Sequence, residues 1–207
     1  MMNKELKIKV CGMRDVENIQ QLLKLPVDYI GFIFYSKSAR FVTERLAISF
    51  PSTIKKVGVF VNASKEEIIT KIKEFDLQVV QMHGDESPEF CQEIKDLSIE
   101  TFKAFGIDDD FNWESISAYE GKVDYFLFDT KSKQYGGTGQ TFDWEKLKDY
   151  PYDTPYWLSG GISLENIEEA ANYKDNKLYG LDLNSKFELE PALKNTDSLT
   201  QAFSILK

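Results

Sequence analysis

Short apolar segments rich in β-branched residues recur along this chain and alternate with longer segments of helical periodicity. Candidate helices occupy residues 16–25, 64–75, 87–97 and 164–172, and serines in capping positions open the second and third. Eight segments of strand length can be read: IKVCGM, YIGFIF, KVGVFV, VVQMH, TFKAFG, YFLFDT, YWLSG and LYGLDL. Alternating strands and helices predict a parallel sheet, and eight units in one short chain favour a closed (β/α)8 TIM barrel over an open, doubly wound sheet.

Nothing in the sequence marks a domain boundary. Proline and glycine occur singly along the chain, and no linker, low-complexity segment or constant repeat is visible. A chain of 207 residues with 42% hydrophobic content can bury one sizeable core. We therefore expect a single barrel domain over residues 1–207.

Charge and segment composition narrow the class of partner. The formal net charge of −9 makes nucleic acid a poor partner, although a local cluster of donors could still bind a small anion. The N-terminal MMNKELK lacks a hydrophobic signal core, and no stretch approaches the roughly 18 consecutive apolar residues of a membrane span. Cys11 and Cys91 have neither a pairing nor a metal-ligand spacing, which suits free thiols in a reducing compartment. We expect a cytoplasmic protein that binds no membrane, and the acidic surface favours a monomer.

Side-chain alternation along each strand separates the barrel interior from the face that meets the helices. The more apolar face must pack on the helices, as Ile8 and Val10 do in the first strand and Tyr179, Leu181 and Leu183 in the eighth. The residues predicted to point inward are then Lys9, Cys11, Gln81, His83, Asp129, Asp182 and Asn184. Buried polar groups are costly unless they are satisfied, so this set predicts a wet pocket near the carboxyl ends of the strands.

Two of these inward residues could carry proton transfer. Asp129 ends a run of aromatic residues, and burial there should raise its pKa into the range of a general acid. Alternatively, its carboxylate caps the next segment or pairs with Lys131 or Lys133. Cys11 ends the first strand, where a small inert core thiol is the alternative to a reactive one. Cys91 lies inside a helical pattern and is assigned to packing.

Glycines and an arginine provide candidate anion contacts. LSGGIS, which contains Gly160 and Gly161, follows the seventh strand and precedes a helix, a position suited to phosphate binding, although a plain strand-to-helix turn would read the same. YGGTGQTFDW fits neither a P-loop nor a dinucleotide fingerprint. Arg40, after the second strand, suits a carboxylate or is a solvated surface charge. His83 is the only histidine, so it cannot form a metal site alone, and we assign it to the pocket wall.

In order, the segments KVCGM, YIGFIFYSKSARFV, VGVFVN, VQMHGDE, FDTKSKQYGGTGQTFDW, LSGGISLENI and GLDLNS closely resemble the phosphoribosylanthranilate isomerase family of tryptophan biosynthesis. The resemblance covers nearly the whole chain. It implies a cofactor-free and metal-free barrel enzyme that binds a small phosphorylated substrate. The implied reaction converts N-(5′-phosphoribosyl)anthranilate into 1-(2-carboxyphenylamino)-1-deoxyribulose 5-phosphate, an Amadori rearrangement.

The resemblance also implies roles for particular residues. The general base of the family falls on Cys11, its general acid on Asp129, and the arginine that contacts the anthranilate carboxylate on Arg40. The other positions implied in substrate binding are Gln81, His83, Gly160, Gly161, Asp182, Asn184 and Ser185, of which Gly160, Gly161, Asn184 and Ser185 bind the phosphate.

The chain departs from the family pattern after the eighth strand. Lys186 stands where glycine is expected, and Ala192 and Asn195 replace a later glycine and aspartate. If the backbone at Lys186 keeps the left-handed conformation of a glycine, the lysine is strained, and we hypothesise that its ammonium compensates by binding the phosphate. Parity also predicts a buried ion pair between Lys9 and Asp182, because the first and eighth strands are neighbours in a closed barrel.

Two other functions fit part of the pattern. Another sugar-phosphate isomerase or aldolase of the same fold is one, such as the aminoaldose isomerase of histidine biosynthesis. That family uses two aspartates, where this chain has Cys11 and Asp129. A noncatalytic protein that binds a phosphorylated ligand is the other. Turnover of phosphoribosylanthranilate separates all three.

Overall fold

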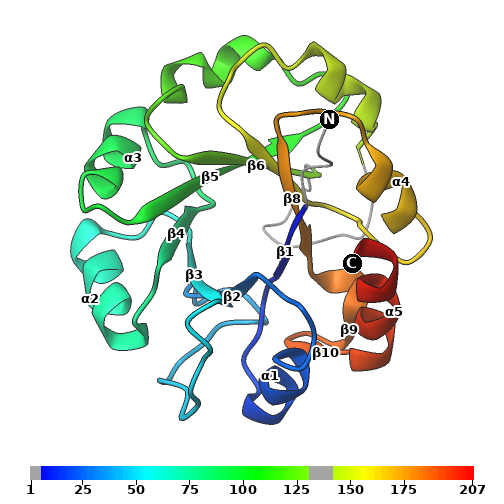
Figure 1. The fold of residues 1–207 in the computed structure, drawn as a ribbon. Helices are drawn as coiled ribbons and strands as arrows, with labels where there is room; N and C mark the ends of the chain where they lie inside the picture. The colour runs from blue at the N-terminus through cyan, green and yellow to red at the C-terminus, as the bar shows by residue number, and fades with distance from the viewer. Residues whose placement is uncertain (1–5, 131–141) are drawn as a thin grey trace.

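The computed structural model describes residues 6–130 and 142–207. The first eight strands close into a parallel barrel in sequence order, with β8 (Leu178–Leu183) paired to β1 (Lys7–Val10). Figure 1 shows these strands at the centre, surrounded by helices. The expected (β/α)8 TIM barrel is confirmed. The remaining barrel strands are β2 (Tyr29–Ile33), β3 (Lys55–Phe60), β4 (Val79–Met82), β5 (Glu100–Ile107), β6 (Tyr125–Thr130) and β7 (Tyr156–Leu158).

The helical layer is less regular than the strand layer. Within the described residues the α-helices are α1 (Val16–Leu22), α2 (Lys65–Phe75), α3 (Pro88–Lys95), α4 (Ile167–Asn172) and α5 (Thr196–Leu206). Short 3₁₀ helices, η1 (Trp113–Tyr119) and η2 (Trp144–Asp149), follow β5 and β6. Residues 34–54, between β2 and β3, contain no helix. All eight expected strands are therefore present, but an α-helix does not follow every one of them.

The four helices expected from the sequence are present with shifted ends. Ser64 and Ser87 cap α2 and α3 by accepting hydrogen bonds from the backbone N–H of Glu67 and Phe90. The helix α1 ends at Leu22 rather than at residue 25, and α4 begins at Ile167 rather than at residue 164. None of the helices in the described residues is long and apolar enough to cross a bilayer.

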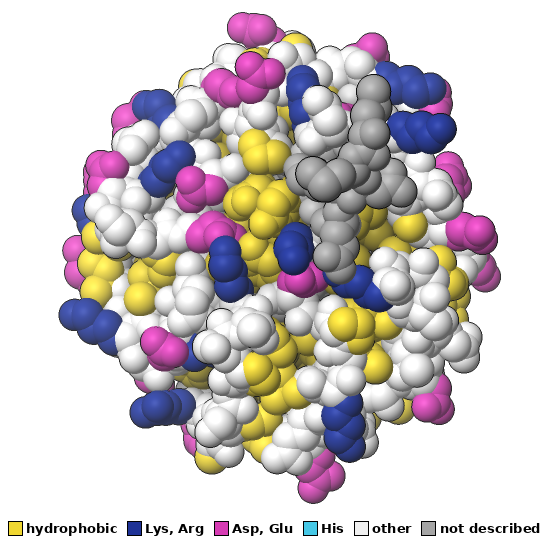
Figure 2. Space-filling view, viewed as in Figure 1, with side chains coloured by type: hydrophobic (Ala, Val, Ile, Leu, Met, Phe, Trp, Pro, Cys, Tyr) yellow, Lys and Arg dark blue, Asp and Glu magenta, His cyan; other side chains and the backbone are white. Residues whose placement is uncertain are grey.

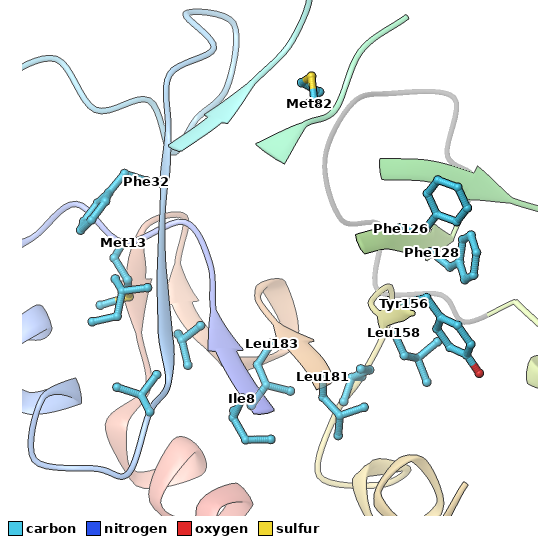
Figure 3. Packing of buried hydrophobic residues seen from close by; sticks show 14 of the residues in the cluster. Ile8, Met13, Phe32, Met82, Phe126, Phe128, Tyr156, Leu158, Leu181 and Leu183 are labelled. Atoms are coloured by element: carbon cyan, nitrogen blue, oxygen red, sulfur yellow. The ribbon is translucent and has the colours of Figure 1, made fainter. Parts of the chain in front are cut away.

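The main hydrophobic core lies between the strands and the helices. Ile8 and Val10 of β1, Phe126 and Phe128 of β6 and Leu181 of β8 are each completely buried there. Figure 3 shows Ile8, Phe126, Phe128 and Leu181 on the side of their strands that packs against neighbouring elements. This is the outward face that side-chain alternation predicted, because apolar positions recur at every second residue.

A second, smaller cluster fills the barrel interior. Its buried members are Cys11, Tyr29, Val57, Val59, Val79, Phe102, Ala104, Leu127 and Trp157. Tyr179 also packs here, with its ring 5.4 Å from Trp157, so the prediction that Tyr179 faces the helices is wrong. The pairing of β7 with β8 skips from Leu178 to Gly180, and this irregularity breaks simple alternation at Tyr179.

The segment after β8 forms the short 3₁₀ helix η3 (Ser185–Phe187) and a hairpin of β9 (Glu188–Glu190) and β10 (Leu193–Lys194). In Figure 1 this hairpin lies beside α5, which also contacts α1. Lys186 has no positive φ, so the expected left-handed strain at Lys186 is wrong. The strain falls instead on Ala192, which is buried and has a φ of 72°.

Candidate functional site

A pocket lies at the carboxyl ends of the barrel strands and collects most of the residues singled out by the sequence. Cys11 and Arg40 lie after β1 and β2, Asp129 is near the end of β6, and Asn184 follows β8. The described residues that line the pocket are Cys11, Ile33, Tyr35, Ser38, Arg40, Val59, Val61, Gln81, His83, Asp129, Ser159, Asp182 and Asn184.

Cys11 leaves β1 with its backbone N–H bonded to the carbonyl of Leu183 at 2.9 Å. The thiol is buried, and burial raises its pKa, whereas the positive charges of Lys9 and Lys194 favour the thiolate. Gly31 on β2 leaves room for this side chain, because a Cβ at Gly31 would lie 2.7 Å from Sγ of Cys11. The absence of a side chain at Gly31 thus makes room for the thiol, and the charges of Lys9 and Lys194 act on it.

The floor of the pocket contains the expected ion pair. Nζ of Lys9 lies 2.7 Å from Oδ2 of Asp182, and the side chains are 0% and 5% exposed. Register places the two residues directly opposite each other on β1 and β8. The predicted pairing of Lys9 with Asp182 is confirmed. It sets one positive and one negative charge beneath Cys11.

The surroundings of Asp129 raise its pKa toward the range that a general acid needs near neutral pH. Burial, with the negative charge of Asp182, raises the pKa of Asp129 to about 6, against a smaller opposing effect of the Thr130 N–H and Lys9. Oδ1 accepts a hydrogen bond from the backbone N–H of Thr130 at 2.8 Å. The alternative partners Lys131 and Lys133 lie outside the described residues, as does most of YGGTGQTFDW.

Gln81 and His83 lie on the wall next to Asp129. The amide Nε2 of Gln81 is 2.9 Å from Nδ1 of His83, and Nε2 of His83 is 3.7 Å from Oδ2 of Asp129. Burial, with the positive charges of Lys103 and Lys9, lowers the pKa of His83 to about 3. The imidazole is therefore neutral at physiological pH.

Arg40 lies at the pocket mouth with part of its guanidinium already engaged. Nε and Nη2 donate to the carboxylate of Glu188, with an Nη2 to Oε2 distance of 2.6 Å. Glu188 also accepts from Nζ of Lys194 at 2.6 Å. Burial acts against ionisation of Glu188, but Arg40 and Lys194 outweigh it and lower its pKa. Sequence reasoning missed Glu188 and Lys194, which no local pattern connects to the site.

Lys194 links this cluster to the end of β8. Its Nζ donates to Oδ1 of Asn184 at 2.7 Å, and the Asn18 side chain bonds both the N–H and the carbonyl of Lys194. Burial lowers the pKa of Lys194 to about 8. Asn184 is thereby oriented in the pocket wall, and Ser185 starts η3 directly after it.

The turn after β7 contains two adjacent glycines with positive φ, a conformation that residues with a Cβ rarely adopt. Gly160 and Gly161 have φ of 82° and 67°. A Cβ at Gly160 would meet the Thr130 backbone nitrogen at 2.4 Å and Oδ1 of Asp129 at 2.7 Å. The helix α4 starts only at Ile167, so an anion here would bind turn N–H groups and not the end of that helix.

Groups of three or more His, Cys, Asp or Glu side chains arranged for a metal ion are not found among residues 6–130 and 142–207. Figure 2 shows acidic and basic side chains interspersed on the face of the barrel viewed in Figure 1. The pocket residues Cys11, Asp129 and Arg40 offer groups for proton transfer and for binding an anion.

Comparison with known proteins identifies relatives over almost the whole chain. Residues 8–204 match the family model described as N-(5'phosphoribosyl)anthranilate (PRA) isomerase. The N-(5'-phosphoribosyl)anthranilate isomerase of Parabacteroides distasonis is 47% identical over 93% of this chain and 89% of its own length.

Solved structures agree with this match. The crystal structure of phosphoribosyl anthranilate isomerase from Thermotoga maritima superposes with a TM-score of 0.85 at 31% identity, covering 97% of this chain and 98% of that one. A phosphoribosyl anthranilate isomerase in complex with reduced 1-(o-carboxyphenylamino)-1-deoxyribulose 5-phosphate superposes with a TM-score of 0.81 at 28% identity, with the same coverage.

Proposed function

This chain belongs to the N-(5'-phosphoribosyl)anthranilate isomerase family, and on that premise we propose that Cys11 is its general base and Asp129 its general acid. The enzyme converts N-(5′-phosphoribosyl)anthranilate into 1-(2-carboxyphenylamino)-1-deoxyribulose 5-phosphate in tryptophan biosynthesis. The observation that carries the assignment of roles is that Cys11 and Asp129 line one pocket from the ends of two strands that are not neighbours.

The rearrangement needs a proton delivered and a proton removed. Asp129 gives its proton to the furanose ring oxygen, the C1′–O bond breaks toward that oxygen, and the lone pair of the substrate nitrogen forms the Schiff base. The Cys11 thiolate then removes the C2′ proton, and the C–H electron pair forms the C1′–C2′ double bond while the C=N electrons return to nitrogen. The resulting enol tautomerises to the ketone product.

The remaining pocket residues bind and orient the substrate. Arg40 faces the anthranilate carboxylate with the donors that Glu188 leaves open, since a guanidinium has five N–H groups. Gly160, Gly161, Asn184 and Ser185 bind the phosphate through turn N–H groups and polar side chains. Gln81, His83 and Asp182 contact the sugar and aniline groups between these two ends.

The charge and the thiols of the chain bear on its oligomeric state and its compartment. We propose that residues 1–207 form a single domain that works as a monomer in the cytoplasm. The net charge of −9 and the two free, buried cysteines support this assignment, because such thiols suit a reducing compartment. Light scattering of the purified chain tests the monomer, and a dimer mass would contradict it.

Turnover of phosphoribosylanthranilate, followed by loss of its anthranilate fluorescence, tests the assigned roles. Cys11→Ala and Asp129→Asn should each lower kcat by on the order of 10²-fold or more, while substrate binding largely survives. Cys91→Ala is the matched control, because Cys91 is buried outside the pocket, in the core between strands and helices. Near-normal turnover in either pocket variant would contradict the role of that residue.

A further inference from the structure

The contact between Gln81 and His83 determines where the histidine carries its proton. Nε2 of Gln81 lies 2.9 Å from Nδ1 of His83, and an amide nitrogen can only donate. Nδ1 must then be the acceptor, and the proton of the neutral ring sits on Nε2. That nitrogen is the one that faces Oδ2 of Asp129, at 3.7 Å.

We propose that Gln81 holds His83 as the neutral Nε2–H tautomer, and that His83 is a positioning residue whose N–H stabilises the Asp129 carboxylate once Asp129 has given up its proton. The inference rests on the proposed role of Asp129 as general acid. At 3.7 Å the two groups are just beyond hydrogen-bond length, and such contacts tighten when substrate closes the site. His83 keeps its own proton throughout the step, so the proton passes only from Asp129 to the ring oxygen.

The charges around the pair explain why a neutral donor is required. Lys103 on β5 and Lys9 on β1 act on His83, and together with burial they keep it uncharged. Asp182 on β8, Lys9 and the Thr130 N–H act on Asp129. An imidazolium 3.7 Å from Asp129 would stabilise the carboxylate before the reaction and so remove the proton the acid must donate. A neutral N–H helps after proton transfer without this cost.

The single histidine makes the tautomer directly measurable. In the full-length protein labelled with ¹⁵N-histidine, long-range ¹H–¹⁵N spectra at neutral pH should show Nδ1 unprotonated and Nε2 protonated. Gln81→Met should give a mixture of tautomers, because the donor to Nδ1 is gone. A wild-type ring protonated on Nδ1 would mean that the Gln81 amide is turned around, and it would overturn the proposal.

Two substitutions at position 83 test the action on Asp129. Glutamine can place an amide N–H near the position of Nε2, whereas the shorter asparagine cannot. His83→Asn should lower kcat by about 10-fold or more, as loss of a hydrogen bond to a charged group predicts, and this effect should exceed any rise in KM from the lost substrate contact. His83→Gln should retain most of the activity. Equal, wild-type kcat in both variants would overturn the proposal.

The pH profile separates this role from a structural one. With the pKa of Asp129 near 6 and that of Cys11 raised, kcat/KM should be flat between the two values and fall below the pKa of Asp129. The fall occurs because further acidification removes thiolate without protonating more Asp129. Gln81→Glu favours the imidazolium, so the acid limb should move to lower pH, whereas Gln81→Met loses part of the Nε2–H tautomer, so its acid limb should move to higher pH.

Different experimental results would contradict this inference and the proposed function. Wild-type protein without turnover of phosphoribosylanthranilate would contradict the function. Turnover with an Asp129→Asn defect, but with acid limbs of Gln81→Glu and Gln81→Met that coincide, would contradict only the role of His83.

Discussion

Nζ of Lys9 lies 2.7 Å from Oδ2 of Asp182, joining two residues 173 positions apart across the seam where β8 meets β1. Both charges are buried, so each stabilises the ionised form of the other against the cost of leaving water. The pair links the first and last strands of the barrel by an ion pair. The positive charge of Lys9 also acts on Cys11.

Removing one partner should therefore destabilise the fold. Lys9→Met leaves Asp182 as a buried, unpaired charge, and we expect it to lower the free energy of unfolding by roughly 3–5 kcal/mol in urea titrations. Lys65→Met is the matched control, because Lys65 makes only an exposed pair with Glu93 and its loss should cost about 1 kcal/mol or less. Equal effects of the two substitutions would show that the Lys9 pair is solvated.

Glu188 should control both stability and substrate affinity through Arg40. Glu188→Gln removes the negative charge between Arg40 and Lys194, so we expect a loss of about 2 kcal/mol or more in unfolding free energy. KM should rise several-fold, because the guanidinium is no longer held at the pocket mouth. Glu190→Gln changes an exposed carboxylate of the same strand and should leave unfolding within about 0.5 kcal/mol. A KM for Glu188→Gln equal to that of the control would argue against this role.

A glycine should stabilise the folded protein at position 192 but not at position 186. Ala192→Gly relieves a left-handed backbone and should raise the free energy of unfolding by up to about 1 kcal/mol, less the entropy that glycine adds to the unfolded chain. Lys186→Gly, in η3 without positive φ, should instead lower it by roughly 0.5–1 kcal/mol. Denaturant midpoints of the two variants measure the difference. The reverse order would place the strain at Lys186.

Because its pKa is raised, Asp129 should lower the stability of the fold at neutral pH although activity depends on it. Its folded pKa of about 6 exceeds the ordinary value of 3.8, so folding is penalised when the carboxyl ionises. The penalty is absent below about pH 4, grows between pH 4 and 6, and reaches roughly 3 kcal/mol above pH 6. Asp129→Asn should thus raise the unfolding free energy at pH 8 more than at pH 4.5, while lowering kcat. Urea titrations at both pH values measure this difference. An equal increase in unfolding free energy at pH 8 and pH 4.5 would contradict the raised pKa of Asp129.

Turnover assays of Lys186→Met test the hypothesis that the Lys186 ammonium contacts the phosphate. Its side chain is exposed in η3, next to Ser185 of the proposed phosphate site. We expect Lys186→Met to raise KM and to make KM less sensitive to ionic strength if the ammonium binds the anion. An unchanged KM and salt dependence would assign Lys186 to solvent.

The sequence alone determined the strands and most of the inward side chains. Strand periodicity is local, so the alternation of Lys9 with Ile8 and of Asp182 with Leu181 could be read directly and led to the predicted ion pair. Asp129 stood out because a carboxylate that ends an apolar strand is costly to bury unless it is paired or hydrogen-bonded, and Cys11 because it ends the first strand on the inward face. The order of the family segments then supplied the reaction.

The tertiary structure decided what depends on contacts between distant segments. The pairing of Arg40 with Glu188 spans 148 positions, and nothing in either local pattern indicates it. The skipped pairing at Tyr179 depends on how β7 and β8 pair, and residues 34–54 connect two barrel strands without a helix. Backbone strain moved from Lys186 to Ala192 because η3 and its hairpin turn the chain later than the glycine pattern suggests. Periodicity along the chain specifies which face a residue lies on, whereas its partner is set only when the barrel closes.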